Sequence, residues 1–356
     1  MPNLADAIPL DVCCTRYHLA CCSSRPGQPA ASHLLLLATA GLLVSAVDVA
    51  VYYTPQTTVF YVSKLDSSGY SPCSLTRPLV QTSLRRVLRL HARKGVPNAI
   101  ALFARAQPQY LFPKSSENPL KNTLDDQSLI KWWLRTLDPF VRSESLISAN
   151  LLIPGFSPRE TDLFLARDNN KWDKGFVFAQ MHTAPALHLF ANIPRFLDDP
   201  KTRFLDELES TGQLSTTSMA AFWELMAERQ ECASGRVVAF VGVRLSELVE
   251  PPPPDIPLYI DEKIYKKAYD SLQYGDFSSK EKAKECTDSW LTGVKSMLGK
   301  KSESWGETIQ GKKQPSIRND PDQMVDVLSV RKPIKRDVDT VIANDLANFV
   351  RKKSKS

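Results

Sequence analysis

A long apolar run near the start of the chain is the feature that most constrains the fold. The run HLLLLATAGLLVSAVDVAVYY extends from His33 to Tyr53, and its uncharged core, Leu34–Val47, ends at Asp48. A transmembrane helix needs roughly 18 to 20 consecutive apolar residues, so this core is too short to cross a bilayer. No basic leader precedes it, as a signal peptide would require. The run therefore predicts a pair of buried β-strands.

The remainder of the first 250 residues alternates strand-like segments with amphipathic helices. VAVYY, TTVFYVSKL, NAIALFARA, ANLLIPG and RVVAFVGVRL are rich in β-branched and aromatic residues, which favours strands. Helical spacing occurs at Leu79–His91, from near Asp126 to Pro139, from Lys201 onward and in SMAAFWELMAERQE. Such a mixture predicts an α/β or α+β domain with a central mixed β-sheet surrounded by helices.

Composition and proline content suggest how the chain is divided. With 356 residues, 43% hydrophobic and 24% charged, it has the composition of a soluble globular protein with one large domain or two modest ones. The segment PPPPD, Pro251–Asp255, marks a boundary because proline removes backbone donors. Helices follow in KIYKKAYDSL and KAKECTDSWLTGVKSML, and residues 299–322 resemble a loose linker. We therefore expect an atypical N-terminal edge (1–50), a core (51–250), a helical part packing on the core (251–312) and a flexible basic tail (313–356).

The net charge of +6 is concentrated in that tail. From Arg331 to the end there are eight basic residues and three acidic ones, which leaves +5. RKPIKR and RKKSKS are typical of a nuclear address or of a handle for an acidic partner, and equally of a merely solvated tail.

The seven cysteines do not form the pattern of a disulfide framework. Four of them cluster in CCTRYHLACC, residues 13–22, and the other three are scattered. Zinc ligands usually come as spaced pairs, and adjacent cysteines rarely reach one ion together, so no metal site is expected. A reducing compartment is the default.

Two adjacent acids stand out in FLDDPKTRFLDEL. Asp198 and Asp199 precede Pro200 and Lys201, at the point where a helix is expected to begin. Both acids are explained if they belong to a solvated helix start, since Asp before a first-turn Pro is a common signature. Alternatively, one acid caps the helix while the other faces a pocket and handles a proton.

LTRPLVQTSLRR predicts a second helix start with a possible binding role. Thr76 is a good N-cap, Pro78 suits the first turn, and Arg77 lies at the positive end of the helix. Such an end either is an ordinary capped helix or binds a phosphate through free backbone amides and the arginine.

The motif KWW places Trp132 and Trp133 side by side on a helix, so their side chains diverge by about 100°. Either both pack in the core, or one is core while the other lines a cavity.

Several blocks in order resemble one known family. They are YVSKLDSSGY, LTRPL, LFARAQPQYLFPKSSENP, LIKWW, FLDDPKTRFLDEL and FWELMAERQECASGR. Together they closely resemble the signature blocks of the fungal histone acetyltransferase family named for regulating Ty transposition, over roughly Val51 to Leu245. This resemblance implies an acetyltransferase fold in which acetyl-CoA lies under a long loop, akin to the metazoan CREB-binding-protein acetyltransferases.

The resemblance also implies roles for particular residues. Leu65, Asp66 and Ser67 would lie by the acetyl and pantetheine end, and Ser74, Leu75, Thr76, Arg77 and Pro78 would cradle the CoA phosphates. Phe103, Arg105, Gln107 and Tyr110 would line the CoA tunnel, and Asn122, Thr123 and Leu124 would touch the nucleotide. Trp132 and Trp133 would wall the acetyl group and substrate lysine, with Asp66, Trp133, Asp198 and Asp199 as the catalytic candidates. Lys201 matches a lysine that the family autoacetylates. The chain departs from the family at Leu65, where alanine is expected, and at Leu197, where proline is expected.

Acetyl transfer gives the acidic pair a chemical purpose. A lysine with a pKa near 10.4 is rarely neutral at pH 7, so supplying the free amine costs roughly 4 to 5 kcal/mol. A carboxylate in the pocket attracts the ammonium and accepts its proton, directly or through water. We favour Asp199 for this role and Asp198 for the cap, with the opposite split as the alternative.

The sequence therefore predicts a nuclear histone acetyltransferase that uses acetyl-CoA, without a metal, to modify lysines of histone H3 presented with H4. The family implies roles in chromatin assembly, the DNA damage response and transcription regulation, and partners among histone chaperones of the anti-silencing-function and nucleosome-assembly-protein types. The alternatives are a non-catalytic histone or nucleic-acid binding module with a degenerate core and, more remotely, a two-carboxylate hydrolase, although adjacent acids rarely straddle a scissile bond.

Overall fold

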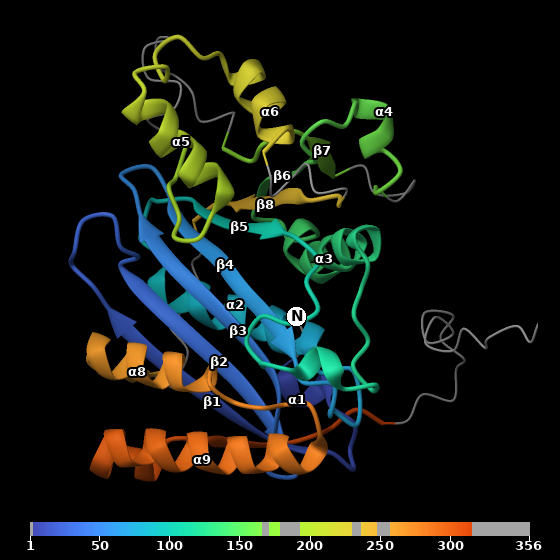
Figure 1. The fold of residues 1–356 in the computed structure, drawn as a ribbon, viewed down its shortest axis with the longest axis vertical. Helices are drawn as coiled ribbons and strands as arrows, with labels where there is room; N and C mark the ends of the chain where they lie inside the picture. The colour runs from blue at the N-terminus through green and yellow to red at the C-terminus, as the bar shows by residue number, and fades with distance from the viewer. Residues whose placement is uncertain (1–2, 166–170, 179–192, 230–235, 248–256, 315–356) are drawn as a thin grey trace, which may run out of the picture. The chain divides into compact units, whose positions relative to one another are not determined.

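The computed structural model describes residues 3–165, 171–178, 193–229, 236–247 and 257–314 (Figure 1). These residues form a ten-stranded mixed β-sheet with helices on both faces, as the sequence predicts. The proline segment Pro251–Asp255 and the basic tail from Arg331 lie outside the described residues.

The sheet has the strand order β10-β1-β2-β3-β4-β5-β8-β6-β7, with β9 paired to β1. The strands are β1 (Cys13–Cys22), β2 (Ala31–Thr39), β3 (Leu42–Tyr53), β4 (Thr58–Ser67), β5 (Asn98–Ala104), β6 (Leu146–Leu152), β7 (Trp172–Lys174), β8 (Ala239–Leu245), β9 (Leu258–Tyr259) and β10 (Glu307–Gln310). The first four strands are antiparallel neighbours, and β5 then runs parallel to β4. Because β4 and β5 are parallel, their carboxyl ends lie at the same edge of the sheet.

The long apolar run forms the strand pair that was expected. Residues of β2 and β3 pair from Ala31 with Val51 to Thr39 with Leu42. Ala40 and Gly41 connect them with positive φ angles of 48° and 76°, the backbone twist that a two-residue hairpin turn requires. A boundary after residue 50 would cut β3, so the first three strands belong to the same sheet as the rest.

The outer edge of β1 is covered by segments from much later in the chain. CCTRYHLACC forms β1 itself, which places its two cysteine pairs at opposite ends of an extended strand, roughly 25 Å apart at about 3.3 Å per residue. β10 pairs with Cys13–Arg16 and β9 with Leu19 and Ala20. The prediction of a loose linker at 299–322 is wrong over its first part, because a 3₁₀ helix (Gly299–Ser304) leads into β10. Buried Ile309 holds β10 to the sheet through a pattern too short to recognise in sequence.

Helices cover both faces of the sheet (Figure 1). One face carries α2 (Thr76–His91) and α3 (Asp126–Val141), and the other carries α5 (Pro200–Ser210), α6 (Met219–Ala227), α8 (Glu262–Leu272) and α9 (Lys280–Leu298). The short elements are α1 (Leu4–Ala7), η1 (Ser115–Glu117) and α4 (Pro158–Thr161). The expected stop of α3 at Pro139 is wrong by two residues, since a proline in the last turn removes only one hydrogen bond from a helix that is already ending.

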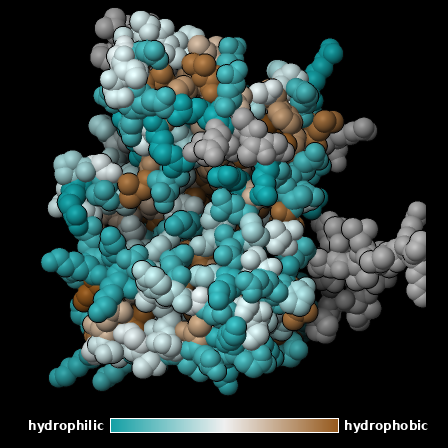
Figure 2. Space-filling view, viewed as in Figure 1, coloured by the Kyte–Doolittle hydropathy of each residue, from teal (hydrophilic) through white to brown (hydrophobic). Residues whose placement is uncertain are grey.

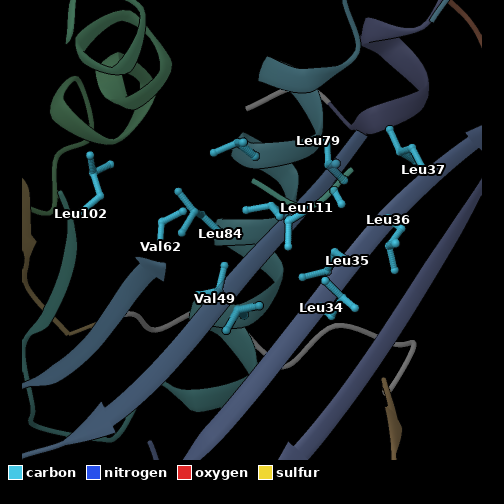
Figure 3. Close-up of a cluster of buried hydrophobic side chains, with 14 of the residues drawn as sticks. Leu34, Leu35, Leu36, Leu37, Val49, Val62, Leu79, Leu84, Leu102 and Leu111 are labelled. Atoms are coloured by element: carbon cyan, nitrogen blue, oxygen red, sulfur yellow. The ribbon is translucent and has the colours of Figure 1, made fainter. Parts of the chain in front are cut away.

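Two groups of buried apolar side chains fill the space between sheet and helices. Figure 3 shows Leu79 and Leu84 of α2 among strand residues that include Val49 and Val62, all part of the larger cluster. A second cluster lies under α5 and α6 and is rich in aromatic side chains, among them Phe178, Phe204 and Phe222. Full burial of one such side chain contributes about 1.5–3 kcal/mol. Figure 2 shows a mostly hydrophilic exterior on this face, with apolar patches over α6 and beside α4.

A chain of buried polar side chains runs between α2 and the strands. Arg86 Nε donates to His18 Nδ1 (3.2 Å), His18 Nε2 lies 3.0 Å from His33 Nδ1, and His33 Nε2 lies 2.8 Å from His91 Nε2. His91 Nδ1 lies 2.7 Å from the Tyr53 hydroxyl. Arg86 can only donate, so His18 Nδ1 accepts and the proton of that ring lies on Nε2. The next two rings repeat the pattern, in which one nitrogen accepts and the other donates. An imidazole can do both only when it is neutral, so all three rings are neutral.

Candidate active site

The acidic pair begins α5, and the two acids play different parts. Asp199 is the N-cap, with Oδ1 accepting the backbone N–H of Lys201 at 3.0 Å and Pro200 in the first helical position. Asp198 has a left-handed φ of 56°, which turns its side chain away from the helix. The expectation that Asp198 is the cap is therefore wrong.

Asp199 also holds the ammonium group of Lys201. Asp199 Oδ2 lies 2.7 Å from Lys201 Nζ, and each side chain is only 1% exposed. The ammonium also donates to the Pro194 carbonyl at 2.6 Å and lies 4.4 Å from the centre of the Phe196 ring. Burial lowers the pKa of Lys201, while Asp199 opposes that shift. The site thus keeps a lysine head group dry, between a carboxylate and an aromatic ring.

Asp198, by contrast, faces an open cavity of about 260 Å³. Its side chain is 81% exposed and lies 4.0 Å from Lys64 Nζ. The adjacent backbone is fixed by Leu197 N–H, which donates to the Tyr52 hydroxyl at 3.1 Å. Of the two acids, only Asp198 has a carboxylate that a large external group can approach.

Asp66 anchors the long loop that follows β5. Its Oδ2 accepts the backbone N–H groups of Tyr110, Leu111 and Phe112 at 2.7–3.0 Å, and its Oδ1 lies 2.7 Å from Lys121 Nζ. Both oxygens are engaged by buried donors, so Asp66 positions the loop over the ends of β4 and β5. The catalytic role that the resemblance implies for Asp66 remains a prediction.

The start of α2 meets the tryptophan motif of α3. Thr76 was expected to be the N-cap, but the N-cap is Leu75. The Thr76 hydroxyl bonds to Ser45 Oγ at 2.9 Å instead. No side chain caps the first amides of α2, and the Arg77 guanidinium lies 5.9 Å from the Trp132 ring centre. The arginine, together with amides that no side chain caps, makes this helix end suitable for an anion.

The two tryptophans diverge as their spacing predicts. Their ring planes meet at 84°, with centroids 5.0 Å apart. Trp133 is buried in the larger core cluster, and Trp132 is only partly buried. Trp132 is therefore the better placed of the two to meet a ligand.

The remaining candidates lie along the anchored loop and its flanks. The Tyr110 hydroxyl donates to the Arg105 carbonyl at 2.6 Å, and the Phe103 ring lies 4.9 Å from Phe240. Leu65 packs against the core at the end of β4, where Ser67 is the last residue. Gln107 is partly buried in the loop, and Ser74, Asn122, Thr123 and Leu124 lie in neighbouring loop segments.

Tyr61 links these groups to the acidic pair. Among the described residues, neither tryptophan forms a hydrogen bond or ring contact with Asp198 or Asp199. The pKa of buried Tyr61 is raised, first by burial and then by Asp199, Tyr52, Asp198 and Tyr110, so these groups all act on its hydroxyl. Tyr61 also stacks on Phe196 with ring centroids 4.2 Å apart and lines the cavity that Asp198 faces, which places it at the start of α5.

Sequence reasoning did not single out Lys121, Tyr52, Tyr61 or Asp48. Lys121 and Tyr61 matter through contacts between distant parts of the chain, which local patterns do not carry. Asp48 gave a signal, because it interrupts the apolar run, and it lines the same cavity as Asp198.

In the part of the chain that the structure covers, no three or more His, Cys, Asp and Glu side chains gather in a way that could hold a metal ion. Within the same residues, no helix combines the length and the apolar character that a membrane span needs.

Comparison with known proteins identifies the family of the chain. Residues 74–293 match the model of the histone acetyltransferase KAT11-type domain. The histone acetyltransferase rtt109 of Aspergillus flavus is 35% identical over 260 residues, which is 59% of this chain and 45% of that protein. The rtt109 of Schizosaccharomyces pombe is 29% identical over 75% of this chain and 76% of its own length. The RTT109 of Candida albicans is 30% identical over 51% of this chain and 48% of its own length.

The fold is also that of a solved relative. The crystal structure of Rtt109 from Aspergillus fumigatus superposes with a TM-score of 0.72 and 29% identity, covering 87% of this chain and 98% of that one. The matched region spans about half the length of the Aspergillus flavus and Candida albicans relatives. A family model covering well over half of the residues, together with this shared fold, places the chain in the KAT11-type histone acetyltransferase family.

Proposed function

We propose that this protein transfers the acetyl group of acetyl-CoA to lysine side chains of histone H3 presented together with H4. The observation that carries the proposal is the start of α5, where cavity-facing Asp198 adjoins the dry Asp199–Lys201 pair. That pair demonstrates an environment in which a lysine ammonium is desolvated, which is the first requirement of the reaction.

Asp198 is the acid we assign to the substrate. Its exposed carboxylate attracts the incoming ammonium and then accepts a proton, directly or through one water. Freeing the amine at pH 7 costs roughly 4 to 5 kcal/mol, because lysine has a pKa near 10.4. The neutral nitrogen then bonds to the thioester carbonyl carbon while the carbon–sulfur bond breaks and CoA leaves as thiolate. The second proton lost by the nitrogen passes to that thiolate, which gives the amide and CoA thiol.

The residues that would hold acetyl-CoA fit its chemistry. The uncapped amides at the start of α2, with Arg77 beside Trp132, suit a pyrophosphate. The loop tied down by Asp66 would lie along the pantetheine arm, lined by Phe103, Arg105, Gln107 and Tyr110. Asn122–Leu124 would meet the nucleotide portion, and Ser74 and Pro78 flank the same helix end.

Lys201 is proposed to accept an acetyl group itself. Acetylation would remove its charge and so release Asp199 from the ion pair, while the N-cap bond could remain. Because Lys201 is buried, the transfer would occur within one molecule, from acetyl-CoA bound at its own site.

The basic tail, Arg331–Ser356, is the basis for two further proposals. One is a nuclear location, and the other is binding to acidic histone chaperones of the anti-silencing-function and nucleosome-assembly-protein types. Its excess positive charge supports a nuclear address or an acidic partner. Deleting it should spare turnover of a short peptide while weakening import or chaperone binding.

The decisive experiment incubates the protein with acetyl-CoA and H3–H4 and reads every lysine by mass spectrometry. Acetylation of H3 that depends on acetyl-CoA and on Asp198 supports the proposal. Tight binding of H3–H4 without any acetylation, at Lys201 or on the histones, would favour the non-catalytic alternative.

A further inference from the structure

The cavity beside Asp198 extends well away from the start of α5. It lies between one face of the sheet and α8, with Asp48 and Tyr52 from β3, Tyr61 and Ser63 from β4, and Tyr265 and Tyr269 from α8 among its walls. At about 260 Å³ it has room for several waters, each of which occupies about 30 Å³, or for one long side chain.

A carboxylate lies at the inner wall of this cavity. Asp48 Oδ2 accepts the Ser63 hydroxyl at 2.5 Å. An ionised carboxylate offers about four acceptor positions, so it has capacity for further donors. Burial raises the pKa of Asp48, and Ser63, Lys64, Tyr269 and Tyr265 oppose that shift. A cation brought to Asp48 would compensate the cost of keeping its charge away from water.

The Tyr265 hydroxyl lies in the same wall, close enough to Asp48 to act on the pKa of that carboxyl. Tyr265 is only 8% exposed, and its oxygen makes no hydrogen bond of ordinary geometry with any described residue. Buried hydroxyls in proteins are nearly always bonded, and the exceptions call for an explanation. A ligand carrying N–H groups would engage both this oxygen and Asp48.

The cavity wall already accommodates one cation. Lys64 Nζ lies 5.4 Å from the centre of the Tyr269 ring and 4.0 Å from Asp198 Oδ2. Tyrosine faces attract ammonium and guanidinium groups within about 6 Å. Glu262 adds a further acid to the wall, although it pairs with Arg25 at 2.6 Å.

We propose that this cavity holds a basic side chain of the protein substrate, a lysine or arginine close to the target lysine in sequence. The inference rests on the proposed function, with Asp198 facing the target lysine itself. An extended peptide advances about 3.3 Å per residue, so a neighbour one or two positions away reaches a cavity that Asp198 itself lines. Asp48 and the Tyr265 hydroxyl then select for a neighbour with N–H donors and positive charge.

The kinetic test uses blocked peptides with one lysine and either arginine or its neutral isostere citrulline, placed one or two residues to either side. In the unaltered protein, arginine at the best position should lower KM about 10-fold, as a charge-assisted bond does. The measured quantity is the KM of the citrulline peptide divided by the KM of the arginine peptide. In Asp48→Asn this ratio should fall to about 1, with kcat on the citrulline peptide unchanged. Tyr265→Phe should reduce the ratio about 3-fold, and it carries the test if Asp48→Asn folds poorly.

Matched controls come from α8 and its end. Asp270→Asn removes a neighbouring acid that does not line the cavity, and Tyr274→Phe removes a hydroxyl from an exposed ring. Both should keep the full arginine preference. An arginine preference that survives in Asp48→Asn and Tyr265→Phe would overturn the proposal.

Direct binding separates this inference from the proposed function. A lysine-free arginine peptide, titrated by calorimetry without acetyl-CoA, should bind about 10-fold more weakly to Asp48→Asn. It should bind more tightly to Lys64→Met, because the Lys64 ammonium no longer competes for the cavity. Damage to the fold would weaken binding, so it could not produce this increase. If histones are not acetylated but these binding changes appear, only the proposed function fails. If acetylation proceeds and both variants bind the peptide like the unaltered protein, only the cavity assignment fails.

Discussion

Lys201 Nζ lies 2.7 Å from Asp199 Oδ2 in a place that water hardly reaches, and the same carboxylate caps α5. One side chain therefore both starts a helix and neutralises a buried charge. Asp198, its neighbour in sequence, is free of both tasks, which is what allows it to face the cavity.

Replacing Asp199 by Asn should damage stability before anything else. Asn preserves the shape and can still cap the helix, but it leaves the Lys201 ammonium buried without a counter-charge, which costs about 3–5 kcal/mol. Chemical denaturation should show that loss in the free energy of unfolding. Adding Lys201→Met should restore part of it, and a single variant within about 1 kcal/mol of the unaltered protein would contradict the buried-pair interpretation.

Asp198→Asn should slow acetyl transfer by about 10² or more while leaving stability unchanged. The side chain is largely exposed, and Asn tolerates the left-handed backbone conformation as well as Asp does. The rate should still rise with pH, from a lower baseline, as more substrate amine becomes neutral. Asp206→Asn, an exposed acid on the same helix, is the control. A normal single-turnover rate in Asp198→Asn would remove it from the mechanism.

Arg77→Ala should weaken CoA about 10-fold or more and affect pantetheine little, because pantetheine lacks the pyrophosphate. Comparing the affinities for CoA, dephospho-CoA and pantetheine also shows which phosphate is bound. Arg85→Ala, on the same helix, serves as the matched loss of charge. An equal loss for all three ligands would mean that Arg77 acts only by packing on Trp132.

Asp66→Asn should loosen the loop without unfolding the sheet. The amide nitrogen would face donors that now bond to Asp66, so hydrogen exchange should accelerate at residues 110–112. Affinity for acetyl-CoA should fall in parallel. Asp276→Asn breaks an exposed ion pair with Lys114, normally worth at most about 1 kcal/mol, and should change neither measurement. Unaltered exchange in Asp66→Asn would show that other contacts hold the loop.

The three linked histidines should make the fold sensitive to mild acid. Burial lowers the pKa of His18 and His33 well below 6.5 and that of His91 to about 4, and Arg86, His33 and His91 add to the shift at His18. The unfolded chain takes up protons below about pH 6.5 that the folded chain refuses, so stability is full above that pH and declines below it.

The decline should reach about 1.4 kcal/mol per pH unit for each histidine. It should continue down to about pH 4 for His91, where the folded state also binds its proton. His91→Gln should reduce the slope of unfolding free energy against pH between 5 and 6.5 by about a third. A slope that is the same in His91→Gln would mean that His91 is not neutral in the folded protein.

The sheet and most of its helices could be predicted because their signals are local. β2 and β3 follow from an apolar run interrupted by one charge, and α3 from the spacing around its tryptophans. The capping residue of α5 was also within reach, since Pro200 in the first helical position makes the preceding Asp199 the N-cap. The cap was assigned to Asp198 because Asp199 was expected to handle a proton, and that assignment did not follow the proline rule.

Other features depend on parts of the chain that meet only after folding. Lys121 comes to Asp66 from 55 residues away, and Tyr265 of α8 meets Asp48 across one wall of the cavity. Periodicity shows that Asp48 interrupts a strand, but it does not show which helix will cover that strand. Similarly, four residues of β10 carry too little pattern to announce a strand.

The pairing of β10 with β1 has a consequence for synthesis of the chain. Arg16 of β1 and Glu307 of β10 form an ion pair between residues 291 apart in sequence, so an edge formed by the first strand waits for one of the last. Throughout translation, β1 would present unpaired backbone groups beside apolar side chains, the kind of edge that recruits other strands. We therefore expect this edge to be shielded from other strands only once residues 307–310 have emerged and paired with it.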